Sequence, residues 1–100
     1  MTGMRIIARK TLHDYWEKHP EVRQALQAWY ADANHAQWKT PADIKDMYRN
    51  ASILPNARVV FNIKGNQYRL IVAIQYNAGI VFIRFIGTHQ EYDRVDASTI

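Results

Sequence analysis

The spacing of apolar residues in the first half of the chain predicts helices. Apolar or aromatic positions recur with a period of about 3.6 residues on both sides of Pro20, at Leu12, Tyr15, Trp16, His19, Val22, Ala25, Leu26, Trp29, Tyr30 and Ala33. We interpret this stripe as core packing. Thr11 is the expected N-cap of the first helix, and Pro20 either kinks that helix or stands in the first turn of a second one. The run TPAD at 40–43 repeats a helix start, so a third helix is predicted to end near Tyr48.

Runs of apolar and β-branched residues predict strands in the second half. The expected strands are Met4–Arg9 near the N-terminus and then Arg58–Lys64, Gln67–Tyr76 and Ile80–Gly87. Gly65-Asn66 and Asn77-Ala78-Gly79 have the composition of hairpin turns, whereas the segment 50–56 is expected to be a loop. The predicted class is therefore α+β, with an N-terminal strand and helices packed on a mostly antiparallel sheet.

The two hairpin turns predict which side chains share a face of the sheet. They place Arg69 opposite Asn62 on one side and opposite Gly87 on the other, with Tyr76 opposite Ile80. The expected core face holds Val59, Phe61, Ile63, Tyr68, Leu70, Val72, Ile74, Ile80, Phe82 and Ile86. The opposite face is expected to collect Arg58, Asn62, Lys64, Arg69 and His89.

Composition narrows the class of protein. A chain of 100 residues favours a single domain over 1–100, with residues 1–3 as a loose leader. There is no cysteine, no apolar run long enough to span a bilayer and no signal-peptide core, so a cytoplasmic location is the simplest interpretation. The net charge of +4 favours a polyanionic partner, although a merely soluble basic surface has the same composition.

The segment GTHQEYDRV at 87–95 raises the question of chemistry, because it ends an apolar strand with side chains that can transfer protons. Cleavage of RNA through its own 2′-hydroxyl needs no metal or cofactor: it needs a cation on the phosphate and groups that move two protons. Arg69 suits the cation, and His89 and Tyr92 are the candidates for proton transfer. Lys64, Arg58 and Asn62 are expected to bind flanking RNA, and Gly87 to leave space for the phosphate.

Structural roles are open for the same residues. His89 is also typical of a hydrogen-bonded residue at a strand end, and Arg69 could form an ion pair with Glu91 or Asp93. Tyr92 could serve only to anchor the C-terminal segment on the core. The four histidines have no metal-ligand spacing, so no metal site is predicted.

Three segments in order resemble the HigB family of bacterial type II toxins. These are WKTPADIKDMY at 38–48, FNI-GN-YRLI at 61–71 and F-GTH-EYD at 85–93, so the resemblance extends over nearly the whole chain. It implies a RelE-like fold, a ribosome-dependent mRNA endoribonuclease and neutralisation by a HigA-type antitoxin with a helix-turn-helix domain. It also implies a phosphate-stabilising role for Arg69. The competing hypotheses are an RNA- or ribosome-binding inhibitor that does not cut, and a corepressor that helps an antitoxin bind DNA.

Overall fold

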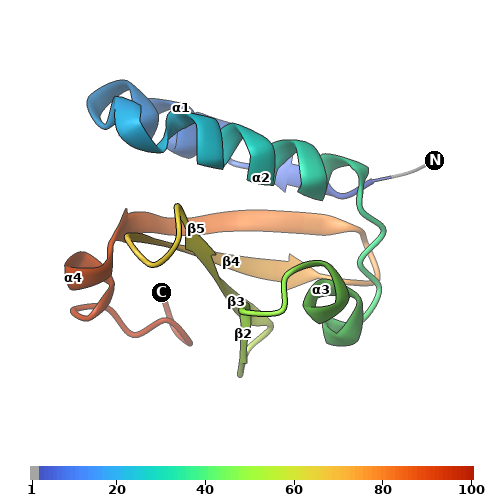
Figure 1. The fold of residues 1–100 in the computed structure, drawn as a ribbon. Helices are drawn as coiled ribbons and strands as arrows, with labels where there is room; N and C mark the ends of the chain where they lie inside the picture. The colour runs from blue at the N-terminus through green and yellow to red at the C-terminus, as the bar shows by residue number, and fades with distance from the viewer. Residues whose placement is uncertain (1–2) are drawn as a thin grey trace.

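The computed structural model describes residues 3–100, which form a five-stranded sheet between two unequal layers (Figure 1). The strands are β1 (Arg5–Ile7), β2 (Ser52–Leu54), β3 (Arg58–Ile63), β4 (Tyr68–Gln75) and β5 (Ile80–Thr88). The helices are α1 (Arg9–Lys18), the 3-10 turn η1 (Pro20–Val22), α2 (Arg23–His35), α3 (Pro41–Met47) and α4 (His89–Tyr92). The strand order is β1-β5-β4-β3-β2, with β1 parallel to β5 and every other pair antiparallel. This confirms the predicted α+β class.

The predicted leader lies mostly outside the described residues, which begin at its last member, Gly3. A Cβ atom at Gly3 would lie 1.7 Å from the carbonyl oxygen of Asn34, so this glycine sits directly against the end of α2.

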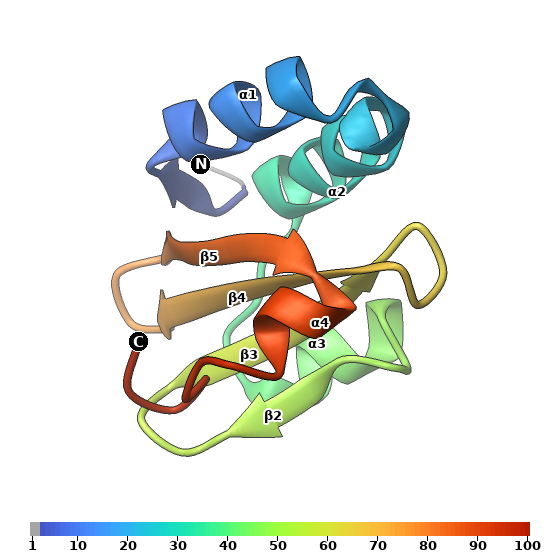
Figure 2. The same cartoon turned by 90° about the vertical axis from the view of Figure 1, so that its left-hand side faces the viewer.

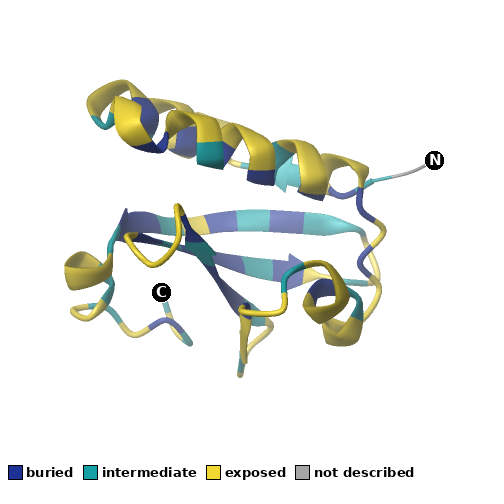
Figure 3. Cartoon of the chain, in the orientation of Figure 1, coloured by how far each residue is buried: buried dark blue, intermediate teal, exposed yellow. Residues whose placement is uncertain are grey.

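One large core lies between the helices and the sheet. Figure 1 shows α1 and α2 as a layer on one side of the sheet, and α4 with the C-terminal segment on the other. Trp29 of α2 and Trp38 place their rings 5.4 and 5.8 Å from the ring of Phe61 on β3. All three side chains are almost completely buried, and Figure 3 shows the same inward burial along the helices. The apolar stripe of the first half is therefore core packing, as predicted.

The helix starts agree only partly with the sequence signals. α3 begins as predicted, because the hydroxyl of Thr40 accepts from the Asp43 amide at 3.4 Å and the Asp43 carboxylate accepts from the Thr40 amide at 3.2 Å. Pro20 opens η1 rather than kinking α1. The N-cap prediction for Thr11 is wrong: α1 already begins at Arg9, and the Thr11 amide donates to the Ala8 carbonyl at 3.0 Å inside the first turn.

The first hairpin pairs as predicted, and the second does so only at one end. Arg69 lies opposite Gly87, but Ile80 pairs with Gln75 instead of Tyr76. A β-bulge in β5 accounts for the difference of one residue between the two ends.

The bulge reverses the alternation of β5. Arg84 is the extra residue, because its neighbours Ile83 and Phe85 face consecutive positions of β4. Val81 and Ile83 are therefore buried in the main core, whereas the core positions predicted for Ile80 and Phe82 are wrong. Arg84 is exposed as a consequence.

The predicted loop at 50–56 is also partly wrong, because it contains β2. Ser52 pairs with Val60 and Leu54 with Arg58, so β2 forms the edge of the sheet beyond β3. A strand of three residues has too few positions to establish an alternating pattern in the sequence.

Candidate active site

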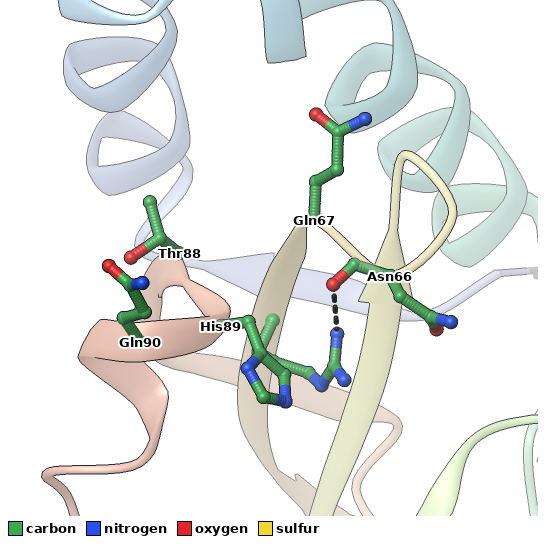
Figure 4. A pocket seen from close by; sticks show the side chains of 6 residues that line it. Asn66, Gln67, Thr88, His89 and Gln90 are labelled. Carbon is green, nitrogen blue, oxygen red and sulfur yellow. Dashed lines mark hydrogen bonds between the residues drawn. The ribbon is translucent and has the colours of Figure 1, made fainter.

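An open cleft of about 520 Å³ lies where the β3–β4 turn meets the end of β5. Its lining residues are Asn66, Gln67, Arg69, Thr88, His89 and Gln90. Figure 4 shows Asn66 and Gln67 on the turn, and Thr88, His89 and Gln90 at the start of α4. The lining contains a guanidinium, an imidazole and several amides, and none of the described residues in it is a carboxylate. The cleft therefore suits an anion.

Arg69 is the second residue of β4, and its guanidinium is held at the cleft by backbone. Its Nη1 donates to the carbonyl oxygen of Asn66 at 3.0 Å, the contact drawn as a dashed line in Figure 4. Its Cζ lies 5.8 Å from the centroid of the Tyr92 ring. Among residues 3–100 no carboxylate pairs with Arg69, so the alternative of an ion pair with Glu91 or Asp93 is wrong. The positive charge is thus available to a ligand.

His89 reaches the cleft because a short helix begins there. The hydroxyl of Thr88 accepts from the Glu91 amide at 3.1 Å, and the Glu91 carboxylate accepts from the Thr88 amide at 2.8 Å. The backbone N–H of His89 donates to the carbonyl of Gln67 at 3.0 Å, which ties α4 to the β3–β4 turn. The imidazole is about half exposed, with its Nδ1 3.6 Å from Oδ2 of Asp93. That arrangement leaves Nε2 as the nitrogen available to a substrate.

Tyr92 lies beside Arg69 but does not line the cleft. It packs against a second apolar cluster formed by Val60, Ile71 and Ala97, which is covered by the C-terminal segment. Figure 2 shows that segment crossing the face of the sheet next to β3 and β2. The anchoring role considered for Tyr92 therefore has direct support from its packing, and its place against Arg69 lets it hold the guanidinium.

The predicted RNA-binding residues are not gathered in one place. Arg58 donates through Nη2 and Nε to the carbonyl oxygen of Ile100, at 2.7 and 3.2 Å, and through Nη1 to that of Asn56 at 2.9 Å. It holds the C-terminal segment and is absent from the cleft lining. Lys64 is exposed on the β3–β4 turn, and Asn62 lines a neighbouring cavity. The expected continuous basic row is therefore interrupted.

Gly87 lies opposite Arg69 as predicted, yet the space beside it is not cleft space. A Cβ atom there would lie 2.6 Å from Cζ of Phe85 and 2.8 Å from Oε1 of Glu91. The absent side chain makes room for the Phe85 ring and for the carboxylate that caps α4. Gly87 thus shapes the site through α4.

A hydrogen bond behind the site joins β4 to the helical layer. The Tyr68 hydroxyl donates to the carboxylate of Glu21 on η1, and this bond raises the pKa of Tyr68 to about 12. The same bond lowers the pKa of Glu21 below its usual 4.5. Burial raises the pKa of Tyr15 to about 12, with the charge of Glu91 adding to the effect. Tyr68, the residue before Arg69, is therefore held in place by a contact with the helical layer.

Four lining residues, Asn66, Gln67, Thr88 and Gln90, were not predicted from the sequence. The pattern Thr88-x-x-Glu91 is a capping-box signature and could have predicted α4. Asn66 and Gln67 act in the described contacts through carbonyl oxygens, which every residue type has, so their side chains gave no signal. Within residues 3–100, no group of three or more His, Asp and Glu side chains could hold a metal ion, and no helix could cross a membrane.

The chain is thus a small basic protein of α+β fold. Its open cleft, which contains a guanidinium and an imidazole, is a site suited to an anionic ligand. Residues 22–95 match the HigB toxin family, the RelE-like toxic component of a toxin-antitoxin system. The chain belongs to this family.

Named relatives match along most of their own length. The mRNA interferase toxin HigB of Escherichia coli K12 is 28% identical over 92 residues, which cover 90% of this chain and 88% of the relative. An mRNA interferase HigB of Shigella flexneri has the same figures. One from Escherichia coli O6:H1 is 26% identical over 94 residues, covering 92% and 91%.

Proposed function

We propose that the protein is an endoribonuclease that cuts mRNA on the ribosome and so arrests translation in the cytoplasm. The observation that carries the proposal is the Arg69 guanidinium, which has no carboxylate partner in the described part of the chain and lies in a cleft that also contains His89. The names of the relatives, which are called mRNA interferases, support the same substrate. A HigA-type helix-turn-helix antitoxin is the proposed neutralising partner.

The proposed reaction uses the RNA as its own nucleophile. The 2′-oxygen attacks the adjacent phosphorus, the bond from phosphorus to the 5′-oxygen breaks, and a 2′,3′-cyclic phosphate and a 5′-hydroxyl are formed. Arg69 stabilises the negative charge that grows on the phosphoryl oxygens, because a guanidinium binds two of them and keeps its charge. His89 carries one of the two protons, through Nε2, either from the 2′-hydroxyl or to the 5′-oxygen.

Cleavage in a translating extract tests this function. Purified protein is added to an extract that translates a defined mRNA, and both new RNA ends are mapped and chemically typed. We expect cuts inside the translated region that leave 2′,3′-cyclic phosphate and 5′-hydroxyl ends, and no cuts when translation initiation is blocked.

Other outcomes identify other functions. Arrested translation with intact mRNA would mean that the protein blocks a site without cutting. Normal translation, with tighter binding of DNA by the antitoxin when this protein is added, would mean that it acts as a corepressor. Cuts that do not depend on translation would contradict the ribosome dependence alone.

A further inference from the structure

A second cavity, of about 370 Å³, lies on the other side of the β3–β4 turn from the active-site cleft. Asn62 and Gly65 line it from the hairpin, and Met47 to Ala51 line it from the end of α3. Asn62 is the direct partner of Arg69 across the two strands, and Arg69 lines the first cleft. Directly opposed residues lie about 5 Å apart. The two cavities are therefore neighbours across one residue pair.

In the described part of the chain, three polar side chains around this second cavity are not used by the fold. Within residues 3–100, the side chains of Arg49, Asn50 and Asn62 have no hydrogen bond or ion pair. The side chain of the nearby Lys45, in contrast, makes two hydrogen bonds: its Nζ donates to the carbonyls of Arg49 at 2.6 Å and Ala51 at 2.9 Å. Lys45 thus fixes the backbone that presents Arg49 and Asn50. The segment is held in place while its own polar groups are left for a ligand.

The apolar wall of the cavity is partly rigid and partly adaptable. The Tyr48 hydroxyl donates to Asp32 at 2.5 Å, and the Tyr48 ring packs edge-on against Phe61 at 5.2 Å, so the ring is fixed. Met47 is 48% exposed beside it, so its side chain is accessible to a ligand. A thioether on a flexible chain adapts to flat aromatic surfaces. None of the described residues that line the cavity is a carboxylate.

We propose that this cavity is a subsite for the nucleotide next to the cleaved bond. Met47 covers the face of the base, the amides of Asn50 and Asn62 bind its edge, and Arg49 binds the phosphate. Recognition of unpaired RNA uses such a combination of apolar base contact, hydrogen bonds to base edges and phosphate contacts. The proposal rests on the proposed function, since it assumes that the scissile phosphate lies at Arg69.

The test is a titration of purified protein into the translating extract, with the amount of cut mRNA as the readout. The double variant Arg49→Gln/Asn50→Ala removes one charge and one amide from the subsite. The matched control Arg23→Gln/Asn34→Ala removes the same groups from the exposed surface of α2. We expect the concentration for half-maximal cleavage to rise roughly tenfold in the subsite variant, with little change at saturation, and not to rise in the control. Equal curves for the two double variants would overturn the subsite.

A crosslink separates failure of the subsite from failure of the function. An mRNA carrying 4-thiouridine next to the mapped cut site is irradiated with the wild-type protein on the ribosome, and the linked peptide is sequenced. We expect the label on residues 47–51 or 61–65. If the mRNA is cut but crosslinks only to other residues, the proposed nuclease function stands and the proposed subsite is wrong. If no mRNA is cut, the proposed function fails, and the subsite that rests on it falls with it.

Discussion

The two faces of the sheet are covered in different ways. On the helix face, one continuous core extends from α1 to α3, and Leu70, Val72 and Phe61 have no exposed surface. On the other face, a smaller cluster around Val60 and Ile71 is covered by α4 and the C-terminal segment. Beyond that cover lies the cleft with its guanidinium and imidazole.

This difference explains where the site lies. A continuous core leaves no position for an unpaired charge, because burying one without a partner is costly. The second face has apolar cover over only part of its area, so a charged side chain at its end can remain accessible. Two arginines on this face have different surroundings: Arg58 holds the C-terminal segment, while Arg69 faces the cleft.

The largest expected effect is on the helix face. Phe61→Ala should lower the free energy of unfolding by about 3–5 kcal/mol, because this ring is fully buried among Trp29, Trp38 and Tyr48. Phe85→Ala on the other face should cost clearly less, because that ring is only half-buried. Urea denaturation of both variants measures the difference. Equal losses would mean that the two faces are equally packed.

A smaller effect is expected at Gly87, which the sequence predicts to leave open space for the phosphate, where a valine could be added without strain. The contacts with Phe85 and Glu91 lead to a different expectation. Gly87→Val should lower the free energy of unfolding by about 1–3 kcal/mol, since the side chain must displace the Phe85 ring and the cap of α4. Gly87→Ala serves as the milder control in thermal melts. A valine variant as stable as the wild type would support the original prediction.

Salt dependence distinguishes the two kinds of cation on the second face. If Lys64 contacts an RNA phosphate, Lys64→Gln should reduce the slope of log affinity against log salt by about 0.7. Arg58→Gln should leave the slope unchanged, even if affinity falls, because Arg58 binds the Ile100 carbonyl. Binding to programmed ribosomes over a salt series gives both slopes. A reduced slope in the Arg58 variant would assign this arginine to RNA after all.

The smallest effect concerns the hydrogen bond behind the site. The pKa of Glu21 is lowered from 4.5 in the folded protein, chiefly because the Tyr68 hydroxyl donates to its carboxylate. Its contribution to stability is therefore present above pH 4.5 and is lost as the pH falls through the lowered value. Glu21→Gln should show a smaller drop in Tm between pH 6 and pH 3 than the wild type, with Glu17→Gln as the control. Identical drops in Tm for all three proteins would mean that the hydrogen bond between Tyr68 and Glu21 makes no contribution to stability in this pH range.

Much of the fold follows from periodicity in the sequence. The helical stripe, the cap at Thr40 and the first hairpin are set by local residues, and each is confirmed. The bulge at Arg84 is not visible in that pattern, because an extra residue in one strand is defined only by its partner strand. The prediction of Arg69 opposite Gly87 is correct although the turn register is not, because the bulge restores the assumed offset.

The site was predictable to the extent that it depends on side-chain chemistry. Arg69 and His89 lie at one cleft, as the paired strands implied. The catalytic roles of Arg69 and His89 stay predictions, and so does the catalytic role of Tyr92. Arg58 has the same charge as Arg69, and its partner is a backbone carbonyl 42 residues away in the chain, which composition cannot reveal. The route of the C-terminal segment depends on tertiary packing alone.

Cleavage by an Arg69→Ala variant tests whether this guanidinium stabilises the reacting phosphate. We expect this variant to melt like the wild type but to cut mRNA in a translating extract about 10²–10³-fold more slowly, which is the cost of losing one stabilising donor in comparable sites. Arg23→Ala removes the same charge from an exposed position of α2, on the helix side, and should cut at the wild-type rate. A folded Arg69→Ala protein that cuts as fast as this control would contradict the proposed site.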